Sequence, residues 1–168
     1  LERDQLTSGT TWHAAGLIGQ LGSSATITKL RNYSLNLYKK LEKETGLSTG
    51  LKQNGSLTVA TSTGRLQELK RQVTTAQLFN VEANEVSKDQ IKSLYPLINT
   101  DDVIGGVHIP KDGQADPVGI TNVLAKGAKQ HGANFIEHCS VKKILIQNKQ
   151  IVGVETNQGK IDCEYIVL

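Results

Sequence analysis

The residues best suited to chemistry in this chain lie in one short loop, residues 6–17. An indole and an imidazole stand side by side there, as Trp12 and His13. The surrounding positions are small or hydroxylated, so they offer hydrogen bonds and let the backbone approach a ligand closely. These surrounding residues are Ser8, Gly9, Thr10, Thr11, Ala14, Ala15, Gly16 and Leu17. The pattern suggests a flat aromatic ligand with a polar tail; the alternative is a loop whose histidine is merely hydrogen-bonded.

No other group of residues forms a convincing catalytic set. His138 and Cys139 are residue types that bind metals, but we expect them on a strand, where neighbours point to opposite faces. A second pair of ligands is also missing, so no metal is expected. His131 falls at the predicted end of a helix, where interaction with the helix dipole is a sufficient role. The sequence contains no convincing Ser/His/Asp arrangement or carboxylate pair, and no catalytic residue is assigned.

The composition is that of a soluble globular protein. Of 168 residues, 38% are hydrophobic and 21% are charged. The basic pairs Lys39-Lys40 and Lys142-Lys143 are too short and too poor in aromatic neighbours to predict a nucleic-acid surface. No apolar run approaches the roughly 20 residues of a membrane span. Cys139 and Cys163 do not make a disulfide framework, and we expect both to be small buried residues in neighbouring strands.

The two ends of the chain suggest an internal fragment. Leu1-Glu2-Arg3 has no initiator Met or signal peptide, and Ile166-Val167-Leu168 has the pattern of a buried strand. In a dinucleotide-binding unit, a G-x-G-x-x-G loop follows the first strand, and an acidic residue about 20 positions later binds the ribose. Glu2 suits that acidic position, at the end of a second strand, with the glycine loop upstream of Leu1. The alternative is that Glu2 is only a surface charge.

Hydrophobic periodicity predicts two long helices in the first half of the chain. One helix is expected over 26–41, with Gly46 as its stop and an apolar stripe on one face. The stripe comprises Ile27, Leu30, Ser34, Leu37 and Leu41. A strand over 56–60 precedes a second helix over 62–78. Its apolar face comprises Leu66, Leu69, Val73 and Ala76. Residues 87–90 fit a capping box for a short helix ending near Pro96.

The second half is richer in strands. A strand is expected over 103–109, and Asp116-Pro117 begins a helix that runs to about Gln130. Further strands are expected over 135–136, 141–146, 151–156 and 160–167, as a meander that returns to a parallel sheet. The fold class is therefore α/β. A piece of a nucleotide-binding domain comes first, a helix-rich insertion follows, and the chain then returns to the nucleotide-binding domain.

The run Thr11-Trp12-His13-Ala14-Ala15-Gly16 resembles the sarcosine and dimethylglycine dehydrogenase family, within the D-amino-acid-oxidase-like superfamily. In that family the histidine is covalently joined to the flavin of FAD. The resemblance therefore implies that His13 carries FAD and that residues 9–17 bind it. It also implies that Glu2 and Arg3 bind at the adenosine end, and that the backbone of Val141 lies against the adenine.

The resemblance also implies an architecture. The expected fold is an FAD-binding Rossmann-like domain of the glutathione-reductase type with an inserted α+β substrate domain. Residues 1–24 and 113–168 would belong to the FAD-binding domain. Residues 25–112 would belong to the insertion, which would roof the flavin. The passage from Gly105 to Pro117 is similar to the one that leads back to the FAD-binding domain, but His108 replaces a frequent aromatic residue and is given no catalytic role.

The implied activity is FAD-dependent oxidative demethylation of an N-methylated amine such as sarcosine or dimethylglycine. A hydride equivalent passes from the N-methyl carbon to the flavin, and the iminium product is hydrolysed or trapped by folate. Tetrahydrofolate would bind in a fused domain outside these residues, the electron acceptor is open, and the fragment alone is expected to be inactive. The location would be the mitochondrial matrix in a eukaryote and the cytoplasm in a bacterium.

Two other functions remain open. Another flavin oxidoreductase of the superfamily, acting on a 2-hydroxyacid or an amino acid, would share the fold without needing Trp12-His13. A non-catalytic regulatory relative would keep the fold but lose the linking histidine. The presence of His13 argues against both.

Overall fold

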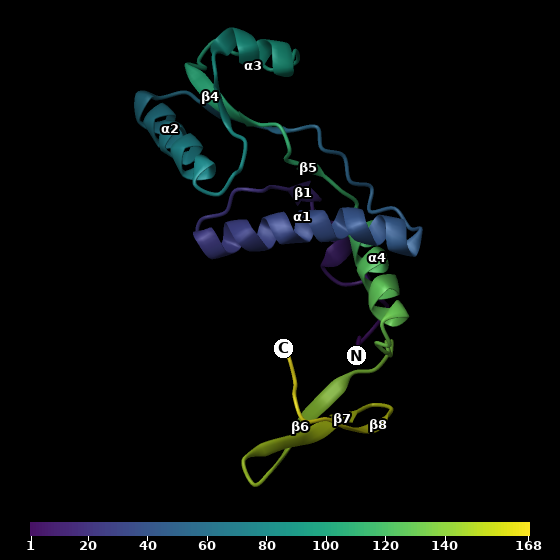
Figure 1. Ribbon diagram of the computed structural model, residues 1–168. Coiled ribbons are helices and arrows are strands. Elements are labelled where there is room, and N and C mark those ends of the chain that lie inside the picture. The colour runs from purple at the N-terminus through teal and green to yellow at the C-terminus, as the bar shows by residue number, and fades with distance from the viewer.

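The computed structural model describes residues 1–168, which form four α-helices, a short 3₁₀ helix and eight strands. The strands form three small sheets, and every strand pair in them is antiparallel. One sheet with two helices lies at one end, the long helix α1 (Ala25–Thr45) crosses the middle, and a separate meander lies at the other end (Figure 1). None of the helices combines the length and the apolar character that crossing a membrane requires.

The main hydrophobic core lies between one sheet and helix α2 (Thr63–Gln77). Strands β2 (Ser56–Ala60) and β3 (Asn84–Val86) flank β4 (Gly105–Ile109), and the short helix α3 (Lys88–Leu94) contacts β4. The core consists of Ala60, Leu69, Val73, Ala76, Val81, Ala83 and Val107. The predicted apolar face of α2 is confirmed, because three of its four residues are in this core and Leu66 packs against it.

Helix starts are set by local capping, as predicted. The Ser62 side chain accepts a hydrogen bond from the first turn of α2, and Ser87 forms a complete capping box with Gln90 at the start of α3. Asp116 caps α4 (Pro117–Gln130), with Pro117 in the first turn, where its missing N–H is tolerated. Strand β3 was not predicted, because its three residues include two polar ones.

Helix α1 is longer than predicted and buries a different face. It ends at Gly46, whose φ of 68° is the left-handed conformation expected of a helix stop. The predicted stripe is wrong, because Ile27 and Leu30 are exposed and only Leu41 is buried. The buried residues are Thr28, Leu35, Leu41 and Thr45. The cause is tertiary: α1 packs on α4, and Thr28 Oγ1 accepts a hydrogen bond from the backbone of the preceding loop.

The C-terminal meander follows the prediction in its strands but not at its edges. Strands β6 (Val141–Gln147), β7 (Gln150–Thr156) and β8 (Gly159–Asp162) pair in chain order. The strand expected over 135–136 is absent, because this segment lies in a loop. The strand expected over 160–167 ends at Asp162, and Val167 is 97% exposed. Cys139 is buried and Cys163 is half-buried, both are free thiols, and neither lies in a strand.

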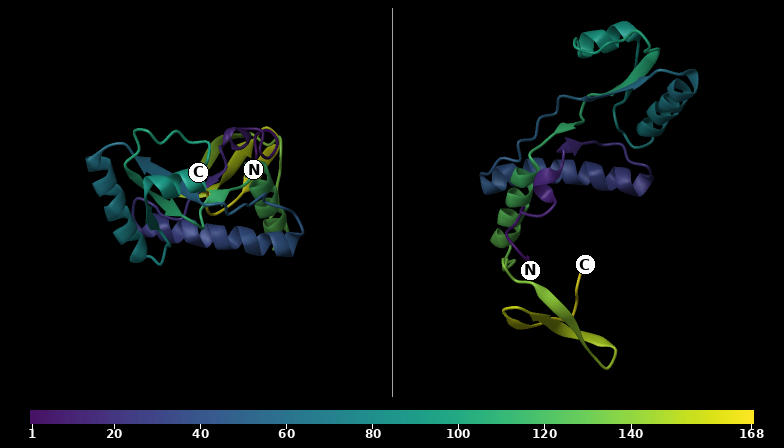
Figure 2. Two further views of the ribbon diagram at one scale, coloured as in Figure 1. Left: turned by 90° about the horizontal axis from the view of Figure 1, so that it is seen from above. Right: turned by 180° about the vertical axis from the view of Figure 1, so that it is seen from behind.

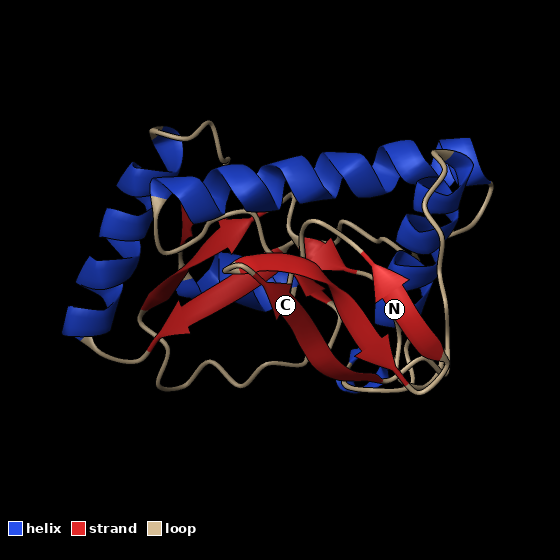
Figure 3. Cartoon of the chain, turned by 90° about the horizontal axis from the view of Figure 1, so that it is seen from below, coloured by secondary structure: helices blue, strands red, loops and turns tan.

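The N-terminal residues contact the second half of the chain at several places, two of them near loop 6–17. Strand β1 (Leu17–Ile18) pairs with β5 (Gly113–Gln114), and the 3₁₀ helix η1 (Thr11–His13) lies against α4. The N-terminus lies near the lower end of α4, between that helix and the meander (Figure 2). Seen from below, α1 runs along one edge of the molecule and the strands lie to one side of it (Figure 3). This arrangement brings loop 6–17 to the middle of the molecule.

Candidate functional site

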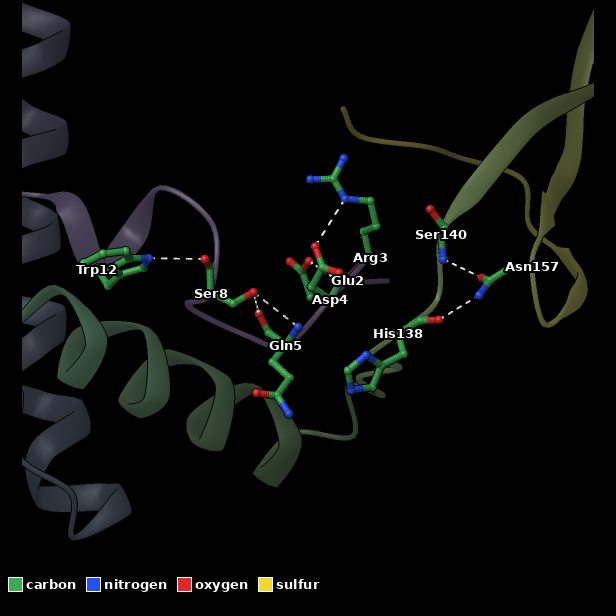
Figure 4. A network of polar contacts seen from close by, with 9 residues as sticks. All are labelled: Glu2, Arg3, Asp4, Gln5, Ser8, Trp12, His138, Ser140 and Asn157. Atoms are coloured by element: carbon green, nitrogen blue, oxygen red, sulfur yellow. Dashed lines mark hydrogen bonds and ion pairs between the residues drawn. The ribbon is translucent and has the colours of Figure 1, made fainter.

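His13 is the last residue of η1 and is exposed. Its imidazole contacts the indole of Trp12, with the ring centroids 3.8 Å apart and the planes tilted by 33°. The indole is itself 60% exposed, and its Nε1–H donates to the Ser8 carbonyl oxygen at 3.2 Å (Figure 4). The aromatic pair predicted from the sequence is therefore a real contact on an open surface.

A concavity of about 510 Å³ lies beside this pair, between the loop and the start of α4. Its lining residues are Thr11, Ala14, Ala15, Gly16, Leu17, Ile18, Pro117, Ile120 and Thr121. Gly16 has a φ of +70°, and a Cβ at this position would overlap the Ala115 carbonyl oxygen. The Gly16 carbonyl oxygen also accepts from the Ala115 N–H at 2.8 Å. Glycine is therefore required where the loop meets α4, while Gly9 and Thr10 are exposed at the other end of the loop.

Glu2 lies beside the segment that leads into β6. Its backbone N–H donates to the Ile136 carbonyl oxygen at 2.9 Å, and its carbonyl oxygen accepts from the Cys139 N–H at 2.8 Å. The sequence placed Glu2 at a strand end; here it is in irregular backbone held by these two bonds. One carboxylate oxygen, Oε1, accepts from the Asp4 N–H at 2.9 Å, and Arg3 pairs with Asp4 at 3.3 Å (Figure 4). Arg3 therefore does not neutralise Glu2.

Val141 is the first residue of β6 and is 46% exposed. Together with Leu1 it lines an apolar concavity of about 380 Å³ on the meander. The residues predicted to bind the adenosine end of FAD therefore lie in one region of the structure, where residues 1–2 meet the start of β6. The loop around His13 forms a second neighbourhood, beside α4.

Asp112 is a structural link that the sequence interpretation missed. Its side chain is buried, with 6% exposure, in the turn between β4 and β5. Oδ1 accepts from the Gln20 N–H at 2.7 Å, and Oδ2 accepts from the Ser56 hydroxyl at 2.6 Å. The Gln20 amide continues this network to Asn32 of α1 at 2.7 Å. The run Lys111-Asp112-Gly113 signals only a turn, so nothing in the sequence marked Asp112 as a residue that joins three segments.

The other candidate residues have structural surroundings. His138 and Cys139 precede β6 instead of lying on a strand, and His138 has a φ of 54°. No group of three His, Cys, Asp or Glu side chains lies close enough to share a metal ion. His108 is half-buried in β4, opposite Leu57 and Asn84, and His131 follows the last turn of α4.

Two carboxylates, Glu42 and Glu68, have lowered pKa values, and each is hydrogen-bonded to a residue nearby in the sequence. The hydroxyl and backbone N–H of Thr49 hold the pKa of Glu42 below its usual range. A hydrogen bond from Arg65 lowers the pKa of Glu68 in the same way. Neither carboxylate is part of the loop around His13, so they are not assigned to the candidate site.

Comparison with known proteins identifies the family of this chain. The family model described as FAD dependent oxidoreductase (DAO) matches residues 1–168, so the chain belongs to that family. It is 41% identical to human mitochondrial sarcosine dehydrogenase, over 99% of this chain and 19% of that protein. It is 34% identical to the mouse mitochondrial pyruvate dehydrogenase phosphatase regulatory subunit, over 99% of this chain and 19% of that protein. Other relatives are named dimethylglycine dehydrogenase and 4-methylaminobutanoate oxidase.

Solved structures agree with the fold. The chain matches L-proline dehydrogenase from P. horikoshii with a TM-score of 0.90 and 31% identity, over 98% of this chain and 43% of that one. The chain spans about a fifth of the length of the curated relatives described above. Two features of the local geometry fit FAD: small residues line an open concavity beside His13, and a carboxylate lies at the predicted ribose end.

Proposed function

We propose that this chain carries part of the FAD site of an enzyme that oxidises an N-methylated amine, such as sarcosine or dimethylglycine. The observation that carries the proposal is the exposed Trp12–His13 pair beside a concavity lined by small residues. The sequence likeness to human sarcosine dehydrogenase supports this substrate class. FAD would supply the chemistry by accepting a hydride equivalent from the N-methyl carbon of the amine.

His13 is the residue proposed to hold the flavin covalently. Its exposure leaves the imidazole accessible to a large ligand, and the concavity begins at its neighbours Thr11 and Ala14. Residues 9–17 would lie along the flavin, with Gly16 permitting the close contact between this loop and α4. A covalent bond would prevent loss of the cofactor during turnover.

Glu2, Arg3 and Val141 are proposed to bind the adenosine end of FAD. Glu2 retains one carboxylate oxygen that no residue of the chain bonds, and Arg3 is engaged by Asp4. The backbone hydrogen bonds of Glu2 to Ile136 and Cys139 support the proposed domain division, because they join the first segment of the chain to the last. Residues 1–24 and 113–168 would form part of the FAD-binding domain, and residues 25–112 would form part of the insertion.

The rest of the proposed activity involves groups outside these residues. Tetrahydrofolate would capture the released one-carbon unit in a further domain, and the electron acceptor is unassigned. In a eukaryote the protein would act in the mitochondrial matrix, and in a bacterium in the cytoplasm; the similarity to mitochondrial sarcosine and dimethylglycine dehydrogenases supports a mitochondrial location in eukaryotes.

A peptide map of the full-length holoprotein tests the covalent link. Trypsin should release residues 4–29 as one peptide, because no Lys or Arg lies between Arg3 and Lys29. We expect this peptide to carry the mass of FAD, and fragmentation to place it on His13. His13→Ala should lose the modification, while His131→Ala, the matched control at the end of α4, should keep it. An unmodified 4–29 peptide from the holoprotein would refute the link.

A non-catalytic regulatory function is the second candidate, because the chain is also similar to a phosphatase regulatory subunit. The two candidates differ in a simple measurement. Under anaerobic conditions, sarcosine or dimethylglycine should bleach the visible absorbance of bound flavin in an amine dehydrogenase. A protein whose bound flavin is reduced by no N-methylated amine, 2-hydroxyacid or amino acid would favour the regulatory candidate.

A further inference from the structure

The contact between Trp12 and His13 is unusual for its position in the chain. The two residues are adjacent in η1, and adjacent residues of a helical turn ordinarily point in different directions. Their ring centroids are nevertheless 3.8 Å apart, with a tilt of only 33° between the planes. Such a contact requires a particular combination of side-chain rotamers at both residues.

Hydrogen bonding fixes the indole in this position. Burial does not, because the side chain is 60% exposed. Its Nε1–H donates to the Ser8 carbonyl oxygen at 3.2 Å, and Ser8 is itself anchored to the Gln5 carbonyl oxygen through its N–H at 3.1 Å and its hydroxyl at 2.8 Å. Turn 5–8 therefore anchors the indole through its hydrogen bond to Ser8 (Figure 4), and the indole ring contacts the His13 imidazole.

We propose that Trp12 is a positioning residue, whose indole holds the His13 imidazole in the orientation required for attachment of the flavin. This inference rests on the proposed covalent link at His13. It differs from a role for Trp12 as a direct cofactor contact, because the indole acts through the imidazole that it contacts. His13 is exposed, and its neighbours Thr11 and Ala14 line the adjacent concavity.

The attachment step explains why orientation matters. One N–C bond forms between an imidazole nitrogen and a methyl carbon of the flavin ring system, while one N–H and one C–H bond break. The two protons and the electron pair reduce the flavin, and dioxygen then reoxidises it with release of hydrogen peroxide. The lone pair of the attacking nitrogen must point at the methyl carbon. Misplacing a reacting group by about 1 Å can slow a reaction roughly a hundredfold.

The test measures the rate of attachment in the full-length protein. Apoprotein from riboflavin-starved cells is mixed with saturating FAD, and samples are denatured over time. The fraction of bound flavin that has become covalent is read from fluorescence in a denaturing gel. This fraction is insensitive to changes in FAD affinity. Trp12→Leu and Trp12→Met should slow attachment between about tenfold and a hundredfold. Trp12→Phe, which keeps an aromatic face but lacks the N–H, should recover part of the loss.

Tyr33→Leu is the matched control, because it removes another exposed aromatic ring, on α1. Attachment in this control should proceed at the wild-type rate. The proposal is overturned if both aliphatic variants attach flavin as fast as the wild type, if Trp12→Phe is as slow as they are, or if Tyr33→Leu is equally slow. A wild-type protein that never attaches flavin at His13 overturns the proposed covalent link as well. Slow attachment confined to the Trp12 variants supports this inference.

Discussion

The carboxylate of Asp112 accepts a hydrogen bond from the Gln20 backbone N–H at 2.7 Å, with both residues buried. Its second oxygen accepts from the hydroxyl of Ser56, the first residue of β2, at 2.6 Å. One side chain thus joins the loop that follows His13 to the sheet that contains the main core. A buried carboxylate with two charge-assisted hydrogen bonds is a strong constraint on the relative position of these segments.

Asp112→Ala should destabilise the protein. It leaves the buried Gln20 N–H without a partner, so we expect a loss of about 2–3 kcal/mol in the free energy of unfolding. Ser56→Ala removes only one neutral donor and should lose about 1 kcal/mol. Urea unfolding of the full-length protein measures both changes. In the double variant the loss should be smaller than the sum of the two single losses, because the Ser56 hydroxyl already lacks its acceptor once Asp112 is replaced by Ala. A fully additive loss would contradict an interaction between Asp112 and Ser56.

Glu2→Gln should weaken FAD binding. A charge-assisted hydrogen bond is worth roughly 1.5–3 kcal/mol, which corresponds to about a ten- to a hundredfold loss of affinity. Reversible binding is best measured by quenching of flavin fluorescence in a His13→Ala background, where no covalent bond can form. Glu164→Gln, at an exposed carboxylate, is the control and should not change the affinity. Equal affinities for Glu2→Gln and its parent would remove Glu2 from the site.

Glu42 should make stability depend on pH. The Thr49 hydroxyl and N–H bond to Glu42 Oε1 at 2.7 and 2.6 Å and lower the pKa of the carboxyl from 4.5. Because the folded-state pKa is lowered, the stabilisation is present above the unfolded-state value and is lost as pH falls through the folded-state value. Glu42→Gln should lose about 0.5–1 kcal/mol near neutral pH. This difference should shrink in acid; a difference independent of pH would argue against the assignment.

Gly127→Val should destabilise the packing of α1 on α4. A Cβ at Gly127 would lie 2.7 Å from Leu41 Cδ2, and Leu41 is buried. Overpacking of this kind typically costs about 1–3 kcal/mol. Gly64→Val is the same substitution in another helix, where no atom lies within 4 Å of the added Cβ, and it should change the melting temperature much less. Equal shifts for the two variants would mean that the contact with Leu41 does not limit packing.

The features that sequence could predict are the local ones. Ser62, Ser87 and Asp116 were identified as helix starts because a cap depends on residues within one turn. Residue types drew attention to the Trp12-His13 motif, and its role in holding flavin was inferred from the family resemblance. Strand β3 escaped prediction because a short polar segment becomes a strand only when β4 lies beside it.

The features that escaped prediction depend on distant residues. The apolar stripe assigned to α1 was wrong because α4 and the preceding loop select which face is buried, and that face includes Thr28 and Thr45. Asp112 could be identified only as a turn residue, since its partners Gln20 and Ser56 are far away in sequence. The strand expected over 160–167 has an apolar pattern, but it leaves β7 after Asp162, where only the Cys163 N–H still bonds to the Val152 carbonyl oxygen, at 3.4 Å.

The contact between Glu2 and the segment before β6 has a consequence for how this region can diverge. Its bonds join main-chain atoms of Glu2 to those of Ile136 and Cys139, so they are indifferent to which side chains those two positions carry. They are not indifferent to chain length. A single inserted or deleted residue between α4 and β6 would shift the register and move Glu2 relative to Val141. We therefore expect the length of this connection to be more tightly constrained than the side chain at the exposed position Ile136.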